Sequence, residues 1–238
     1  MITTSNITKA FRNRNALDNV SVEFPRSSVT AIVGPNGSGK TTLMKILLGL
    51  VRPTHGAFTI DGSDGVNNSD ARRRMGYMAQ IARYPENLTA LEVVSMIRGL
   101  RRNAETIDID ALVQQFALTE HMAKPMRSLS GGTRQKVGAV IAFMFKPTML
   151  LLDEPTAGLD PVAADRLKGK ILEARDGGAS VVVTSHLLSE LQEVDDIVVY
   201  LQDGKVIHHG SVELLLQQSG ASSLSDAVLS LMVHGGKQ

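Results

Sequence analysis

A glycine-rich segment that begins at residue 34 has the residue types and spacing of a phosphate-binding loop. It follows the β-branched run Ser28–Val33 and precedes apolar residues at helical spacing. Glycines let backbone N–H groups surround an anion, and a helix N-terminus adds partial positive charge. Lys40 would neutralise the β- and γ-phosphates and the Thr41 hydroxyl would bind Mg²⁺, whereas the alternative is a simple glycine-rich turn. The predicted contacts are Gly34, Pro35, Asn36, Gly37, Ser38, Gly39, Lys40, Thr41 and Thr42.

Two adjacent carboxylates lie where a second predicted strand ends. The apolar run Met149–Leu152 is followed directly by Asp153 and Glu154, and open α/β sheets bind ligands at the carboxyl ends of their strands. Asp153 suits the surroundings of Mg²⁺. Glu154 suits a general base or a water-orienting residue, because hydrolysis needs a water molecule in line with the terminal phosphate. The alternative is a helix N-cap beside a surface acid.

The elements that must position these residues alternate between strands and helices, which indicates an α/β fold. Strands are predicted at residues 20–24, 28–33, 57–60, 149–152 and 180–184, with a hairpin at residues 197–208. Between about residues 89 and 145 the apolar residues follow three- and four-residue spacing, which predicts an inserted helical lobe. A short amphipathic helix is predicted at about residues 222–232.

Composition excludes several classes of protein. The chain has 238 residues, a formal net charge of +1 and no cysteine, which excludes a polybasic binder, a disulfide scaffold and a cysteine nucleophile. No stretch reaches the roughly 18 consecutive apolar residues of a membrane span, and the N-terminus lacks the pattern of a secretory signal. The histidines other than His186 show no metal-ligand spacing, and the ten methionines are expected to fill the core.

Two further motifs complete a family pattern. The segment Asp153–Asp160 reads DEPTAGLD, and Leu129–Gly132 reads LSGG between the phosphate loop and the acidic strand. Together with the phosphate loop, these motifs resemble the ATP-binding cassette family over essentially the whole chain. The resemblance implies one nucleotide-binding domain over residues 1–238. Its α/β fold would combine a P-loop NTPase core that has a mostly parallel sheet, an antiparallel β subdomain and an inserted helical subdomain.

The resemblance also implies roles for individual residues. Two cassettes of this family sandwich two ATP molecules, so Ser130, Gly131 and Gly132 would contact the nucleotide of a second copy of the chain. Thr133 departs from the glutamine that many members carry there. The other matching positions are Gln80, which would link Mg²⁺ to the attacking water, Asp160 at the dimer interface, His186 at the γ-phosphate, and Phe11, 29 residues before Lys40, against adenine.

Three of these residues also have a purely structural interpretation. Gln80 could lie in a surface turn, His186 could be a satisfied core residue, and Phe11 could be a core phenylalanine at a strand end. Stacking on adenine needs only the face of an aromatic ring, so phenylalanine can replace the tyrosine of many relatives.

The family resemblance leaves two classes of function to weigh. The first is the ATP-hydrolysing subunit of a transporter, cytoplasmic and held at the inner face of the membrane by separate polytopic membrane subunits. The second is a non-transport cassette ATPase that acts on DNA or ribosomes. DNA-associated members carry long coiled coils between the glutamine and LSGG, whereas 48 residues separate Gln80 from Leu129 here. Transport without a nucleic-acid partner is therefore the prediction.

The remaining resemblances concern cargo and coupling. The C-terminal segment resembles that of bacterial exporter cassettes, and residues 76–89 are similar to cassettes of copper-processing systems that serve nitrous oxide reductase maturation. Tyr84, Pro85 and Leu88 lie where relatives receive a helix of the membrane subunit. We expect these three residues to form an exposed partner patch.

Overall fold

A six-stranded sheet forms the centre of the chain. The computed structural model describes residues 1–12, 14–101, 105–185 and 196–234. The strand order is β11-β10-β4-β9-β8-β7, and every neighbouring pair is parallel except β10 and β11. The strands are β4 (Ser28–Val33), β7 (Met75–Met78), β8 (Met149–Asp153), β9 (Ser180–Thr184), β10 (Ile197–Gln202) and β11 (Lys205–Ser211).

The middle strands of this sheet are buried along their whole length. All residues of β4, β8 and β9 are buried, as expected for parallel strands covered by helices on both faces. Since β4, β9 and β8 are adjacent and parallel, their carboxyl ends lie at one edge of the sheet. That edge carries Gly34, Ser185 and Asp153, each of which follows or ends one of these strands.

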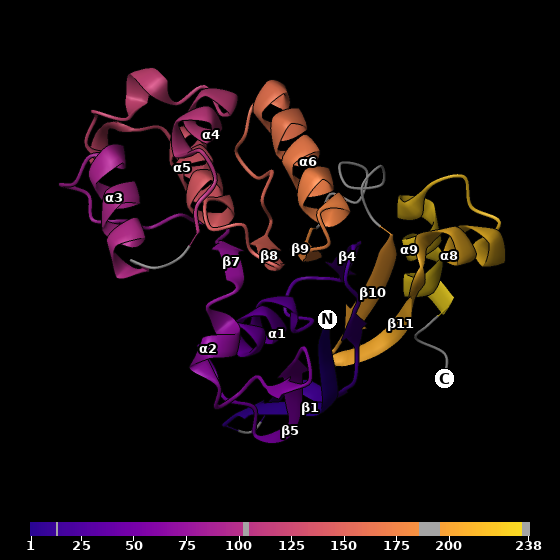
Figure 1. Cartoon of the computed structure of the whole chain (residues 1–238). Coiled ribbons are helices and arrows are strands. Elements are labelled where there is room, and N and C mark those ends of the chain that lie inside the picture. The colour runs from indigo at the N-terminus through magenta and orange to yellow at the C-terminus, as the bar shows by residue number, and fades with distance from the viewer. Residues whose placement is uncertain (13, 102–104, 186–195, 235–238) are drawn as a thin grey trace.

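A second sheet is antiparallel and lies below the first in Figure 1. Its order is β2-β1-β5-β6, with β3 also paired to β1. Its strands are β1 (Ile2–Phe11), β2 (Arg14–Val20), β3 (Glu23–Phe24), β5 (His55–Ile60) and β6 (Ser63–Asp64). The prediction of one strand over residues 20–24 is wrong. Residues 21 and 22 separate β2 from β3, because the Val22 N–H donates a hydrogen bond to the side-chain hydroxyl of Thr4 at 2.7 Å instead of to the backbone of a neighbouring strand.

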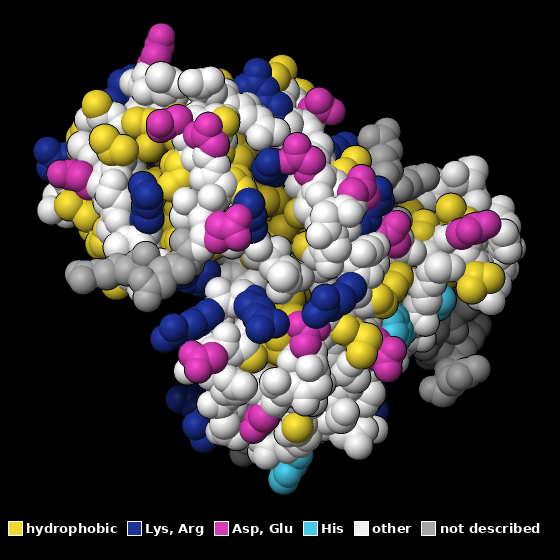
Figure 2. All heavy atoms as spheres, viewed as in Figure 1, with side chains coloured by type: hydrophobic (Ala, Val, Ile, Leu, Met, Phe, Trp, Pro, Cys, Tyr) yellow, Lys and Arg dark blue, Asp and Glu magenta, His cyan; other side chains and the backbone are white. Residues whose placement is uncertain are grey.

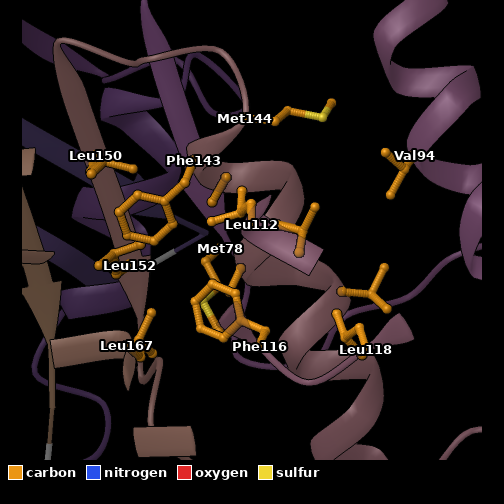
Figure 3. Close-up of a cluster of buried hydrophobic side chains, with 14 of the residues drawn as sticks. Met78, Val94, Leu112, Phe116, Leu118, Phe143, Met144, Leu150, Leu152 and Leu167 are labelled. Atoms are coloured by element: carbon orange, nitrogen blue, oxygen red, sulfur yellow. The ribbon is translucent and has the colours of Figure 1, made fainter. Parts of the chain in front are cut away.

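The helices α3 (Ala90–Leu100), α4 (Ile109–Gln115) and α5 (Gly131–Phe143) form a helical lobe, at the upper left of Figure 1. Two short 3₁₀ helices, η1 (Thr119–His121) and η2 (Met126–Ser128), lie between α4 and α5. Thr89 and Glu92 form a capping box that begins α3. Figure 3 shows Phe116 and Phe143 beside Met78 and Leu152, so one hydrophobic core joins the lobe to the sheet.

The lobe and the sheet approach each other closely at Gly76 on β7. A Cβ atom there would lie 2.1 Å from the carbonyl oxygen of Ala142. We therefore expect Gly76→Ala to lower the free energy of unfolding by about 1–3 kcal/mol, as overpacked cores do. Urea denaturation would measure the change. Gly169→Ala is the matched control, because nothing lies within 4 Å of the added atom in a helix; equal stability of Gly76→Ala and the parent would contradict the packing described.

The other helices of the described residues lie outside the helical lobe. They are α1 (Lys40–Leu47), α2 (Ser69–Arg72), α6 (Pro161–Asp176), α8 (Val212–Ser219) and α9 (Leu224–His234). The last two pack on β4 and β10 through Val33 and Tyr200. The predicted C-terminal helix at residues 222–232 is thus found as α9, shifted by two residues. None of the described helices has both the length and the apolar character that crossing a membrane requires.

Candidate nucleotide site

The glycine-rich loop joins β4 to α1, and its backbone needs glycine at two close approaches. A Cβ on Gly34 would lie 2.0 Å from the carbonyl oxygen of Leu201, and one on Gly39 would lie 2.6 Å from that of Ala16. Gly34, Gly37 and Gly39 all have positive φ, at 148°, 81° and 111°. These glycines allow the loop to curl in front of the N-terminus of α1.

Lys40 and Ser38 show that this loop suits an anion. The Lys40 ammonium donates hydrogen bonds to the carbonyl oxygens of Gly34 at 2.7 Å and Pro35 at 3.1 Å, so it lies under the loop. Burial lowers the pKa of Lys40, and the carboxylates of Glu154 and Asp153 oppose that shift. Ser38 Oγ is buried and has no hydrogen-bond partner among the described residues. A bound phosphate would supply both the missing partner and a nearby negative charge.

The loop lines a cavity of about 520 Å³ that brings distant parts of the chain together. Phe11 lies in its lining with 52% of its surface exposed, and the Lys9 ammonium lies 5.0 Å from the ring centre. This exposure contradicts the alternative of a core phenylalanine. The lining residues are Phe11, Arg14, Ala16, Asn36, Gly37, Ser38, Gly39, Lys40, Thr41, Thr42, Gln80 and Glu154.

Two of these lining residues, Arg14 and Ala16, were missed by the sequence analysis. Arg14 is the antiparallel partner of Phe11 in the β1–β2 hairpin, so both side chains stand on the same face of the hairpin. Once the hairpin is recognised, its register places a guanidinium beside the ring that would contact the base. Nothing in the residue types alone marks Arg14.

The acidic pair is held by the neighbouring strand β9. Asp153 Oδ1 accepts a hydrogen bond from Thr184 Oγ1 at 2.5 Å, and the Glu154 backbone N–H donates to the carbonyl and hydroxyl oxygens of Thr184 at 3.0 and 3.1 Å. The alternative of an N-cap for the acidic pair is wrong, because Asp160 caps the next helix, α6. Thr184 therefore holds the carboxylate of Asp153 and the backbone of Glu154, a role that its place in a β-branched run does not reveal.

Gln80 meets Glu154 at the mouth of the cavity. Its Nε2 donates a hydrogen bond to Glu154 Oε2 at 2.6 Å, although 74 positions separate the two residues. Gln80 is exposed just beyond β7, whereas Glu154 has a positive φ of 47° directly after β8. The structure thus places an amide and a carboxylate side by side next to the phosphate loop.

The residues present fit Mg²⁺ held together with phosphate oxygens. Within the described ranges, no three His, Cys, Asp or Glu side chains come together in a way that could hold a metal ion. Mg²⁺ usually keeps few protein ligands and takes the rest from phosphates and water. Thr41, Asp153 and Gln80 would be those ligands, and the ion would neutralise charge on the β- and γ-phosphates. Of these three residues, only Asp153 is buried, with 6% of its surface exposed.

The LSGG segment lies outside this cavity. Ser130 is the N-cap of α5, where its Oγ accepts a hydrogen bond from the Thr133 N–H at 3.2 Å and lies 2.8 Å from Thr133 Oγ1. Ser130 and Gly131 are exposed, Gly132 is partly exposed, and none of them lines the cavity. Asp160 does not line it either. His186 lies outside the described residues.

A phosphate loop at the end of a central parallel strand, beside an acidic pair, defines a P-loop nucleotide hydrolase. The sequence model of the ABC transporter family matches residues 17–157. The chain therefore belongs to the ABC transporter family, and it is one of that family's ATP-hydrolysing cassettes.

Individual relatives and solved structures agree with this assignment. The lantibiotic transport ATP-binding protein SrtF of Streptococcus pyogenes is 31% identical, over 87% of this chain and 89% of its own length. The ABC transporter ATP-binding protein NatA of Bacillus subtilis is 29% identical over 99% of both chains. A solved ATP-binding subunit of an ABC transporter superposes with a TM-score of 0.90 at 27% identity, covering 98% of this chain and 99% of that one.

Proposed function

We propose that this chain binds and hydrolyses ATP to energise transport by separate membrane-spanning subunits. The observation that carries this proposal is the contact between Gln80 and Glu154 at the mouth of the phosphate-loop cavity. Glu154 acts there as the base that takes a proton from the attacking water. The Gln80 amide orients the Glu154 carboxylate and connects it to the helical lobe, while Lys40 neutralises the phosphates.

We further propose that two copies of the chain close around two ATP molecules. Exposed Ser130 and Gly131 lie outside the cavity, at the N-terminus of α5, where backbone N–H groups suit an anion. They can therefore contact a nucleotide only if a second copy presents it. A dimeric structure of an ATP-binding cassette in a post-hydrolysis state, bound to ADP and Pi, supports this arrangement. It has a TM-score of 0.80 at 25% identity and covers 89% of this chain and 98% of that one.

We propose that the direction of transport is export. The lipopolysaccharide export system ATP-binding protein LptB of Haemophilus influenzae supports this direction, because it is 30% identical over 91% of this chain and 92% of its own length. We place this chain at the cytoplasmic face of the membrane, bound to its membrane subunits. The similarity of residues 76–89 to copper-processing cassettes stays a prediction. In such systems the transported substrate contacts the membrane subunits, so the sequence of the cassette carries little information about it.

The surface for the membrane subunits differs from the predicted patch. Tyr84 and Leu88 are only partly exposed and pack against the core of the helical lobe, and burial raises the pKa of Tyr84 to about 12. They contribute packing, so the expectation that they form an exposed cluster with Pro85 is wrong. Ile81 instead is 66% exposed beside a groove of about 360 Å³, and Figure 2 shows further hydrophobic side chains on the lobe.

We therefore expect Ile81→Glu to abolish transport and weaken co-purification with the membrane subunits, because a charge would replace the apolar contact. ATP hydrolysis by the isolated chain should stay within about twofold of the parent, as surface substitutions usually have small effects. Leu229→Glu is the matched control, since Leu229 is 56% exposed on α9. Full transport by Ile81→Glu, or failure of the parent to co-purify with a polytopic membrane protein, would contradict this assignment.

A further inference from the structure

The N-terminal turns of α5 contact the loop between β8 and α6 at two points. A Cβ on Gly132 would lie 2.6 Å from the Gly158 carbonyl oxygen. One helical turn later, the Lys136 ammonium lies 2.9 Å from Asp160 Oδ2. Residues four apart share one face of a helix, so a single face of α5 holds the loop that begins at Glu154.

Lys136 and Asp160 form an ion pair in which the lysine is the more buried partner. The Lys136 side chain is 18% exposed and that of Asp160 is 54% exposed. The hydrogen bond from Lys136 lowers the pKa of Asp160, and the bond from the Ala163 N–H lowers it further. Asp160 therefore holds the start of α6 with one carboxylate oxygen and Lys136 with the other.

The loop between Glu154 and Asp160 is short and internally hydrogen-bonded. The Ala157 N–H donates to the Glu154 carbonyl at 3.1 Å, and the Leu159 N–H donates to the Thr156 carbonyl at 3.0 Å. Two successive turns of this kind restrict the distance between the two ends of the loop. These two overlapping turns connect the backbone of Glu154 to Leu159, the residue before Asp160.

The same helix also holds the other half of the Gln80–Glu154 contact. Gln135 is 3% exposed, and its Nε2 donates to the carbonyl oxygen of Ala79 at 3.2 Å. Ala79 directly precedes Gln80. Neighbouring residues of α5 thus anchor the two segments that bring the amide and the carboxylate together.

We propose that Lys136 is a positioning residue for ATP hydrolysis, acting through Asp160 to hold the Glu154 loop against α5. The inference rests on the proposed function, because it assumes that Glu154 serves the hydrolytic reaction. In the proposed dimer, α5 begins at the segment that contacts the second nucleotide. The Lys136–Asp160 pair then ties the position of Glu154 in one site to the occupancy of the other.

The test uses three variants that separate charge from other roles. Lys136→Met removes the ammonium and keeps most of the aliphatic stem, whereas Lys136→Arg keeps a positive charge. Asp160→Asn removes the negative charge and keeps a side chain that caps helices as well as aspartate does. Rates of phosphate release at a series of ATP concentrations give kcat and KM for each variant, and thermal melting reports whether each one is folded.

We expect Lys136→Met and Asp160→Asn each to lower kcat about tenfold, with KM for ATP within about twofold, a size typical of coupled neighbours. The double variant Lys136→Met with Asp160→Asn should be no slower than the slower of the two single variants, because both substitutions remove the same interaction. Lys136→Arg should keep at least about half of the parent kcat, since the charge remains.

Three results would overturn the inference: a parent-like kcat for Lys136→Met, effects of the two substitutions that multiply in the double variant, or an arginine variant as slow as the methionine variant. If the parent-like kcat came with a raised KM, Lys136 would act on binding instead. Failure of the proposed function is distinguishable, since in that case the parent itself would hydrolyse no ATP.

Discussion

Lys40→Ala is expected to lower ATP affinity by about 10²-fold or more, the usual effect of removing one partner of a desolvated charge pair. The Lys40 ammonium lies under the phosphate loop, bonded to the carbonyls of Gly34 and Pro35. Without it, those two carbonyl oxygens lose their donor and the phosphates lose their nearest cation. ATP binding and hydrolysis should therefore fall together.

Equilibrium binding of a fluorescent ATP analogue to the purified variant would measure this effect directly. Lys45→Ala is a matched control, because Lys45 lies on the same helix and is exposed. The control should bind as the parent does. An affinity of Lys40→Ala within a few-fold of the parent would show that the loop does not hold the phosphates in the way described.

Glu154→Gln is expected to slow hydrolysis by about 10²–10⁴-fold while ATP binding survives, as the loss of a general base predicts. The substitution preserves the size of the side chain but removes its basic carboxylate. Binding should persist because Lys40 and the loop amides make the phosphate contacts. The Thr184 bonds to the Glu154 backbone N–H do not depend on the side chain.

Single-turnover hydrolysis with excess enzyme would separate the slow chemical step from binding and release. Asp165→Asn is the control, because Asp165 is an exposed acid on α6 and does not line the cavity. It should hydrolyse ATP at the parent rate. If Glu154→Gln reached a rate within a few-fold of that control, another group would have to be the base.

The residues that surround the phosphates could be predicted because each stands next to a strongly patterned strand. A β-branched run precedes Gly34 and an apolar run precedes Asp153, and parallel strands place their carboxyl ends at one edge. That reasoning also predicts that Lys40 and Glu154 lie near each other. The glycines carry a further signal, because a positive φ and a close backbone approach both exclude larger residues.

The adenine side of the cavity could be predicted only in part. The β1–β2 hairpin that pairs Phe11 with Arg14 has register shifts, and its polar residues do not alternate with apolar ones in a regular way. Strand pairing of that kind depends on tertiary contacts that single-sequence patterns do not show. Thr184 was missed for a similar reason, because its partners Asp153 and Glu154 come from another strand.

The prediction of an exposed patch failed because exposure depends on packing between elements. Tyr84 and Leu88 lie in the loop between β7 and α3, where polar surroundings favour exposure. The core of the helical lobe, however, packs against them and leaves them only partly exposed. Ile81, three residues before Tyr84, stays exposed instead, and no local pattern distinguishes the two positions.

The central claim is that two copies of this chain enclose ATP between the phosphate loop of one and the LSGG segment of the other. Size-exclusion chromatography with light scattering on Glu154→Gln, with and without ATP and Mg²⁺, tests it most directly. We expect a dimer that forms only with ATP, because bound nucleotide stabilises the state that holds it best. Adding Ser130→Arg should abolish that dimer and leave ATP binding by the monomer intact. A Glu154→Gln protein that binds ATP but stays monomeric at high concentration would contradict the account.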